Sequence, residues 1–137
     1  MTEQFAGRWI SESSENVEAF MQALGSNWIM QKLASNLPIK IEMEVKIDGN
    51  HGKINIYTII KNFNLEFELG KEFEDTGGDG KKKMSTFTFE EGKLIKIEKA
   101  TKVGEKDTKN VTFIENGKMI QIAECDGVKC TRTFIRV

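Results

Sequence analysis

The sequence predicts a mainly β protein, built from about ten short antiparallel strands with two helices near the start. Apolar and polar residues alternate from residue 39 onward, and glycine-containing turns interrupt the alternation at intervals of about 8–12 residues. Helical periodicity occurs in one place only, before residue 39. These features fit a β-sandwich or an up-and-down β-barrel. Helices confined to one insertion between the first two strands favour the barrel, because a helix pair can lid one of its mouths.

Length and composition indicate one domain that covers residues 1–137. The chain is 39% hydrophobic and 30% charged with a formal net charge of -1, which is typical of a soluble globular protein and excludes a disordered or collagen-like one. Acidic and basic residues are interleaved, so nucleic acid is not expected as a partner, because binding its phosphates requires a concentrated basic surface. The first residues lack the pattern of a signal peptide, which favours a cytoplasmic location.

The first elements are expected to be a short strand around Trp9 and two helices in tandem. The run Ser13–Asn16 offers side chains that cap a helix, and Gly25 and Pro38 each end an apolar stripe with helical spacing. The first stripe consists of Val17, Phe20, Met21 and Leu24, and the second of Trp28, Ile29, Leu33 and Leu37.

Strands are expected in the rest of the chain. Between residues 39 and 47, apolar residues alternate with lysine and glutamate, which is the pattern of a half-buried strand. The segment Asp48–Gly52 is interpreted as a turn, and a returning strand follows over Ile54–Ile60. The remaining strands are expected at residues 63–69, 72–75, 82–89, 93–100, 108–115, 118–124 and 128–136.

Several short motifs occur in a characteristic order along the chain. They are Gly7-x-Trp9, Asn16-x-Glu18-x-Phe20-Met21, Leu24-Gly25, Phe67-x-Leu69-Gly70-x-Glu72-Phe73, Asp79-Gly80-Lys81, Gly92-Lys93-Leu94 and Cys130-Thr131-Arg132-Thr133-Phe134. Each motif is weak alone, but together they span residues 5–134. In this collinear arrangement the sequence resembles the intracellular fatty-acid-binding proteins of the calycin group.

The resemblance implies a ten-stranded antiparallel up-and-down β-barrel, capped by a helix-turn-helix between the first two strands. It further implies a cytoplasmic monomer that binds and transports long-chain fatty acids inside the barrel cavity, without a cofactor and without catalysing a reaction. Retinoic acid and bile acids are alternative ligands within the same fold. A lipocalin-type transporter is less favoured, because such proteins usually carry a signal peptide and disulfides.

The same resemblance assigns the ligand head group to four residues. The family often places two arginines inside the barrel. The one on the last strand corresponds to Arg132, and the other position falls at Thr112, as in the liver-type branch. Phe134 stands where a tyrosine is usual, and Gln121 completes the set. Counting back from Gly117 turns Thr112 inward, whereas simple alternation turns its apolar neighbours inward, and a slip of one residue reverses every side chain.

Arg132 is the strongest candidate for binding an acid. It shares one face of the last strand with Cys130 and Phe134, so its guanidinium should lie beside an apolar side chain. Arginine does not lose its proton in proteins, and burying its charge without a partner is costly. A carboxylate ligand would supply the partner through charge-assisted hydrogen bonds. The alternative is a surface arginine paired with one of the 21 acidic residues.

Apolar residues of the helices and of the nearby strands are expected to contact the ligand tail or to line its portal. They are Phe20, Met21, Leu24, Ile29, Leu33, Ile60 and Phe63. The alternative is that they form an ordinary core, in which side chains rather than ligand fill the space between them. The lysines of Lys81–Lys83 suggest transient contact with an anionic membrane, although a solvated hairpin is the favoured interpretation.

No feature of the sequence indicates an enzyme or a metal site. His51 is the only histidine, and it lies in a predicted turn without a nucleophile motif. Cys125 and Cys130 lack metal-ligand spacing and are expected to be free thiols. No catalytic residue and no metal ligand is therefore assigned.

Overall fold

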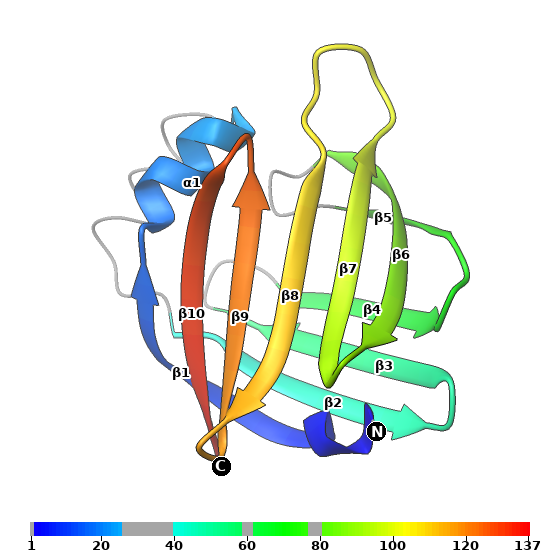
Figure 1. Cartoon of the computed structure of the whole chain (residues 1–137), viewed down its shortest axis with the longest axis vertical. Helices are drawn as coiled ribbons and strands as arrows, with labels where there is room; N and C mark the ends of the chain where they lie inside the picture. The colour runs from blue at the N-terminus through cyan, green and yellow to red at the C-terminus, as the bar shows by residue number, and fades with distance from the viewer. Residues whose placement is uncertain (1, 26–39, 59–61, 77–80) are drawn as a thin grey trace.

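Ten antiparallel strands wrap into a nearly closed barrel, as predicted (Figure 1). The structure is a computed structural model that describes residues 2–25, 40–58, 62–76 and 81–137. The strands are β1 (Gly7–Glu15), β2 (Glu42–Asp48), β3 (His51–Tyr57), β4 (Asn62–Glu68), β5 (Phe73–Thr76), β6 (Lys82–Glu90), β7 (Lys93–Ala100), β8 (Thr108–Glu115), β9 (Lys118–Cys125) and β10 (Val128–Arg136). Their order in the sheet is β4-β3-β2-β1-β10-β9-β8-β7-β6-β5, which is an up-and-down topology joined through β1 and β10.

The sheet is open between β4 and β5, two described strands that do not pair with each other. Side chains and one backbone contact cover this seam. The Phe67 and Phe87 rings stack with centroids 4.1 Å apart, and the Gly70 N–H donates to the Phe87 carbonyl at 2.8 Å. Phe67 fits because Gly52 has no side chain: a Cβ at Gly52 would lie 2.2 Å from the ring. The seam is therefore closed by aromatic packing rather than by a strand ladder.

The end of the barrel that holds both termini is covered by a short 3-10 helix, η1 (Thr2–Phe5) (Figure 1). Phe5 and Trp9 are each 1% exposed, and Trp9 Nε1 donates to the Phe5 carbonyl at 2.9 Å. Arg136 fastens this segment from β10, since its guanidinium donates to two backbone carbonyls at 2.8 Å and lies 4.2 Å from the Trp9 ring. This end is therefore filled by side chains of the chain itself.

The helix α1 (Val17–Leu24) lies between β1 and β2 along the chain, at the end of the barrel opposite η1 (Figure 1). Its apolar face packs on the β9–β10 hairpin. This cluster consists of Phe20, Met21, Leu24, Cys125 and Cys130. Gly25 ends the helix in the left-handed conformation with φ of 76°, as its position after the stripe predicted. The second predicted helix lies outside the described residues.

The predicted helix cap at Ser13–Asn16 was wrong. The first three of these residues extend β1, where Ser13, Ser14 and Glu15 pair with β10. Asn16 does occupy the N-cap position, but it has φ of 62° and makes no side-chain capping bond. Its Nδ2 instead donates to the Lys129 carbonyl at 2.8 Å. Residues 13–15 therefore extend β1 and Asn16 holds it against β10, and they do not cap the helix through their side chains.

The predicted turn at Asp48–Gly52 was too long. Gly49 and Asn50 alone connect the strands, because Asp48 already pairs with His51. His51 is thus the exposed first residue of β3, and Gly52 follows it on the buried face beneath Phe67. Two glycines so close together suggested a loop, but only Gly49 belongs to the turn.

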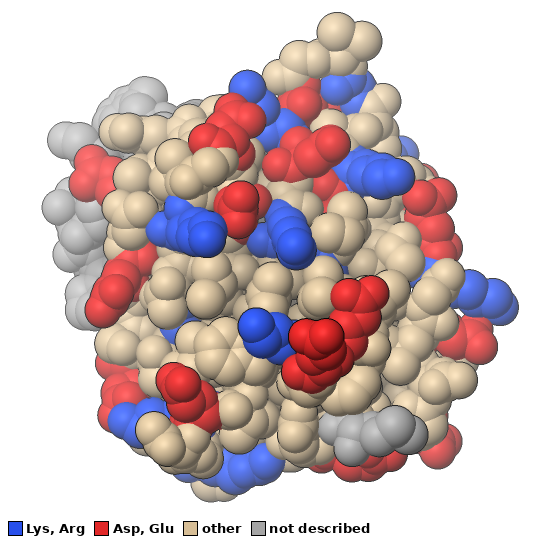
Figure 2. Space-filling view, in the orientation of Figure 1, with Lys and Arg blue, Asp and Glu red and all other residues tan. Residues whose placement is uncertain are grey.

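Charged residues of both signs are interleaved on the face of the molecule formed by β7 to β10 (Figure 2). Several of them form ion pairs, with Lys106–Asp126 and Lys118–Glu12 both at 2.8 Å. The described part of this face therefore carries no large patch of one sign. Among the described residues, no helix is long and apolar enough to cross a membrane.

Candidate ligand-binding site inside the barrel

Thr112, Gln121 and Arg132 lie side by side on three neighbouring strands. Thr112 on β8 is the register partner of Gln121 on β9, which is in turn the partner of Arg132 on β10. Thr112 is 7% exposed, and Gln121 Nε2 donates to its Oγ1 at 3.4 Å. Because directly opposed residues of antiparallel strands point to the same side of a sheet, all three side chains face the barrel interior. The count from Gly117 therefore gave the correct register.

Phe134 follows Arg132 on the same face of β10 and is 0% exposed. Its register partner on β9 is Met119, which is 1% exposed and belongs to the same core cluster. The wall next to Arg132 is therefore apolar toward the η1 end of the barrel. Since Phe134 has no hydroxyl, the three polar side chains on β8, β9 and β10 are the hydrogen-bonding groups of the predicted head-group set.

The guanidinium of Arg132 makes no hydrogen bond or ion pair with the described part of the chain. Its Nε is buried and lacks a hydrogen-bond acceptor. The Arg132 charge opposes the effect of burial on a neighbouring thiol, because burial raises the pKa of Cys130 and the guanidinium lowers it to a smaller extent. A buried cation without a counterion is unfavourable, so this position favours binding of an anion.

A second set of polar side chains covers the inner face of β5, β7 and β8. Lys96 Nζ lies 2.6 Å from Asp75 Oδ2 and 3.5 Å from Glu98 Oε2. Glu98 Oε1 also accepts hydrogen bonds from Thr108 Oγ1 at 2.7 Å and from Asn110 Nδ2 at 3.1 Å. We call these five residues the inner polar cluster. Its two carboxylates are engaged by the cluster itself, so they do not neutralise Arg132.

Lys83 shows that the interpretation of Lys81–Lys83 as a solvated hairpin was wrong in part. Its side chain is 0% exposed and lies on the inner face of β6, opposite Asp75 on β5. Its Nζ donates to the Lys106 carbonyl in the loop between β7 and β8. Lys82, by contrast, is exposed and pairs with Glu74 at 3.5 Å. The three lysines therefore do not form one exposed basic patch.

The fold agrees with that of known proteins. The model of the lipocalin / cytosolic fatty-acid binding protein family matches residues 6–137. The chain belongs to this family. Fatty acid-binding protein homolog 6 of Caenorhabditis elegans is 37% identical over 136 residues, which cover 99% of each chain. Retinol-binding protein 1 of Rattus norvegicus is 33% identical, over 100% of this chain and 99% of that protein. A crystal structure of apo lipid binding protein 8 of Caenorhabditis elegans has a TM-score of 0.93 and 30% identity, and covers 100% of this chain and 98% of that chain.

Proteins of the fatty-acid-binding protein family are non-enzymatic carriers, so this chain is a binding protein rather than an enzyme. Among the described residues, no group of three or more histidine, cysteine, aspartate or glutamate side chains is arranged to hold a metal ion. Cys125 and Cys130 are buried thiols that are not joined in a disulfide.

The tail and portal residues predicted from the family resemblance are only partly described. Phe20, Met21 and Leu24 pack on the hairpin cysteines, which accounts for their burial without a ligand. Phe63 is half-buried on β4, opposite Ile56 of β3. The other three candidates, Ile29, Leu33 and Ile60, lie outside the described residues. The part of the portal that they would form is therefore left as a prediction.

The sequence interpretation missed the inner polar cluster. Simple alternation favours Ile95 and Ile97 as the buried residues of β7, but Lys96 and Glu98 face inward. The signal that identifies them is the turn at Gly92, because counting from it pairs Lys96 and Glu98 with buried residues of β6, Phe87 and Ser85.

A separate surface hollow of about 480 Å³ lies over β3 and β4. It is lined by Lys53, Asn55, Asn64, Leu65 and Glu66. Lys53 and Glu66 form an exposed ion pair there, with their charged atoms 3.8 Å apart. The hollow includes none of the predicted ligand-binding residues, and its polar rim does not suit an apolar tail. We therefore place the candidate site among the inward-facing side chains.

Proposed function

We propose that this protein is a cytoplasmic, monomeric carrier that holds a long-chain fatty acid inside its barrel, with the carboxylate at Arg132. The observation that supports the proposal most strongly is the buried Nε of Arg132, which has no hydrogen-bond acceptor in the described part of the chain. A carboxylate would pair with it through short charge-assisted hydrogen bonds. The name of the nematode relative, a fatty acid-binding protein homolog, points to the same ligand class.

Two neighbouring side chains complete the proposed head-group site. Gln121 and Thr112 follow Arg132 across the sheet, and each has a donor that can reach a carboxylate oxygen. Phe134 would contact the first part of the alkyl chain instead of the carboxylate. The tail would extend toward the α1 end, because η1 and its aromatic side chains fill the other end. Each methylene buried there contributes about 0.8 kcal/mol to binding.

A retinoid is the second candidate ligand, because the rat relative with 33% identity is named a retinol-binding protein. Retinol ends in a hydroxyl, which would leave the Arg132 charge without a counterion. Retinoic acid and bile acids carry a carboxylate and satisfy the same requirement as a fatty acid. We therefore expect the affinity of the head-group site to differ more between an acid and an alcohol than between one acid and another.

We expect oleate to displace a fluorescent long-chain fatty acid from the protein at least about tenfold more strongly than oleyl alcohol does. The reason is that a hydrogen bond to a charged group contributes about 1.5–3 kcal/mol, whereas a tenfold difference requires about 1.4 kcal/mol. Displacement titration of the two compounds measures this ratio. Equal displacement by acid and alcohol would show that Arg132 does not bind the head group.

A further inference from the structure

We propose that the barrel contains a second, neutral polar subsite at Ser85, and that this subsite binds a hydroxyl group carried on the chain of the fatty acid. The inference rests on the proposed function, since it assumes that a fatty acid occupies the barrel. It narrows the ligand class to hydroxylated long-chain fatty acids. The residues that carry it are on β5 to β8, away from the head-group site on β8 to β10.

Ser85 has a buried hydroxyl without a hydrogen-bond partner. Its residue is 0% exposed, and its Oγ makes no hydrogen bond in the described part of the chain. The side chain faces the barrel interior, because it alternates on β6 with outward residues and shares its face with Lys83 and Phe87, both buried. A buried hydroxyl without a partner is unfavourable and uncommon in folded proteins. A polar group of the ligand would satisfy it.

The surroundings of Ser85 are polar and held in place. Its register partner on β7 is Glu98, whose carboxylate is fixed by hydrogen bonds from Thr108 and Asn110 and by Lys96. On its other side, on β5, Ser85 lies opposite Phe73. A ligand hydroxyl at Ser85 could therefore exchange hydrogen bonds with the serine and lie next to an anchored carboxylate acceptor. An alkyl group at the same place would bury these polar atoms without compensation.

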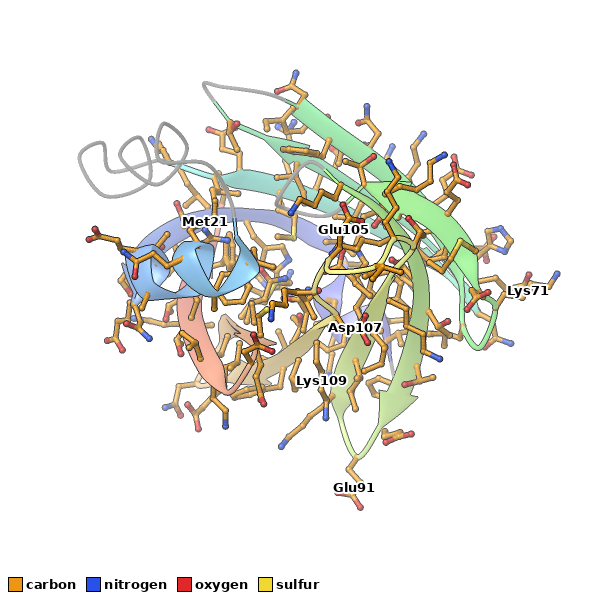
Figure 3. All side chains as sticks on the ribbon, turned by 90° about the horizontal axis from the view of Figure 1, so that it is seen from above. Met21, Lys71, Glu91, Glu105, Asp107 and Lys109 are labelled. Carbon is orange, nitrogen blue, oxygen red and sulfur yellow. The ribbon has the colours of Figure 1, made fainter. Side chains whose placement is uncertain are left out.

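The charges on the inner faces of β5, β6 and β7, around Ser85, favour a neutral ligand group over a second carboxylate. Asp75 and Glu98 balance Lys83 and Lys96 on the inner faces of β5, β6 and β7. Glu105, in the loop above the same wall and at the α1 end of the barrel, adds a further carboxylate, one oxygen of which is buried without a partner (Figure 3). Among the described residues here, an incoming carboxylate would find both lysines already engaged, in contrast to Arg132. A hydroxyl brings no charge that needs to be paired.

The subsite is too far from Arg132 to bind the same end of the ligand. Thr112 of the head-group site and Thr108 of the inner polar cluster lie four residues apart on β8, a separation of about 13 Å along a strand. Ser85 shares the level of Thr108, because Glu98 pairs with both residues. The hydroxyl would therefore lie well along the alkyl chain from the carboxylate.

Isothermal titration with hexadecanoate, 12-hydroxyhexadecanoate, 16-hydroxyhexadecanoate and hexadecanedioate tests the proposal. We expect at least one hydroxy acid to bind about fivefold more tightly than hexadecanoate, and the diacid to bind more weakly than hexadecanoate. In the Ser85→Ala variant, the preference for the hydroxy acid should disappear. In the matched Thr86→Ala variant the preference should persist, because Thr86 is the next residue of β6 and points to the opposite face.

The outcomes separate this inference from the proposed function. If hexadecanoate and both hydroxy acids bind to the unmodified protein with equal affinity, or if the preference survives Ser85→Ala, the subsite is wrong and the carrier function stands. If no acid binds at all, both proposals fail. The unmodified protein alone supplies the first comparison, so the test does not depend on the folding of either variant.

Discussion

Replacement of Arg132 by glutamine is expected to weaken oleate binding by at least about tenfold. Glutamine retains a hydrogen-bond donor on a shorter side chain but removes the charge, so the carboxylate loses its charge-assisted hydrogen bonds. The stability of the ligand-free protein should be unchanged or higher, because the substitution removes a charged group whose buried Nε has no acceptor in the described structure. Isothermal titration gives the affinity, and urea denaturation gives the free energy of unfolding.

Arg136→Gln is the matched control, because Arg136 lies on the same strand but bonds to backbone carbonyls at the η1 end. This control should lower the free energy of unfolding while leaving the oleate affinity unchanged. Suppose instead that Arg132→Gln retains full oleate affinity and loses several kcal/mol of stability. Arg132 would then be a structural ion-pair residue, and the carboxylate site would have to be elsewhere.

Replacement of Lys96 by methionine is expected to lower the free energy of unfolding by about 3 kcal/mol, because it removes the cation that two buried carboxylates share. The side chains of Lys96, Asp75 and Glu98 are 12%, 14% and 7% exposed, so solvent provides little compensation. Methionine has a similar length and retains most of the packing, including part of the contact with the Phe87 ring, 5.5 Å from Lys96 Nζ. Urea denaturation measures the change.

A control variant and a combined variant test whether the lost stability comes from the charge of Lys96. Lys99→Met removes an exposed lysine from the same strand and should change the stability by no more than about 0.5 kcal/mol. When Asp75→Asn and Glu98→Gln are combined with Lys96→Met, most of the lost stability should return, since the two side chains that lose Lys96 no longer carry a charge. A loss that persists in the combined variant would mean that packing, rather than charge, is the contribution of Lys96.

Strand positions were predictable because the turns are well marked. The bounds of β7, β8 and β10 agree with the predicted segments, and each of these strands adjoins a two-residue turn ending in glycine. Both residues of these turns have positive φ, for example 54° at Asn116 and 76° at Gly117. This conformation matches the twist of a tight hairpin, which is why the residue pair locates the turn so well. Conversely, Gly52 misled the prediction because its role is to make room for Phe67.

The direction of the side chains was harder to predict than the strands. In β7, β8 and β9 several apolar residues face outward, where they form cross-strand ladders such as Ile95, Val111 and Ile122. These neighbours partly cover one another, so the outer surface tolerates them. The interior holds Glu98 and Lys96 because each finds a partner there: Glu98 accepts a hydrogen bond from Thr108 of β8, and Lys96 forms an ion pair with Asp75 of β5. Such pairing depends on register, which composition and alternation alone do not determine.

The position of Arg132 was predicted from the sequence, whereas its lack of a partner in the described part of the chain is visible only in the structure. The family resemblance identified the residue, and the position of Cys130 and Phe134 on the same face gave its direction. Only the structure shows that its Nε is buried without an acceptor, and that Asp75 and Glu98 are engaged elsewhere. The second polar region at Ser85 could not be predicted, because a serine within a strand of mixed polarity gives no sequence signal.

The most direct measurement is mass spectrometry of an organic extract of the protein, purified without denaturation and without added lipid. We expect long-chain carboxylic acids in an amount close to one equivalent per chain, because we propose that a carboxylate binds Arg132 and that a long tail occupies the apolar part of the barrel. The extract of Arg132→Gln should contain much less acid. Protein that carries no lipid, or that carries a neutral alcohol in place of an acid, would contradict the proposal that this protein is a fatty-acid carrier.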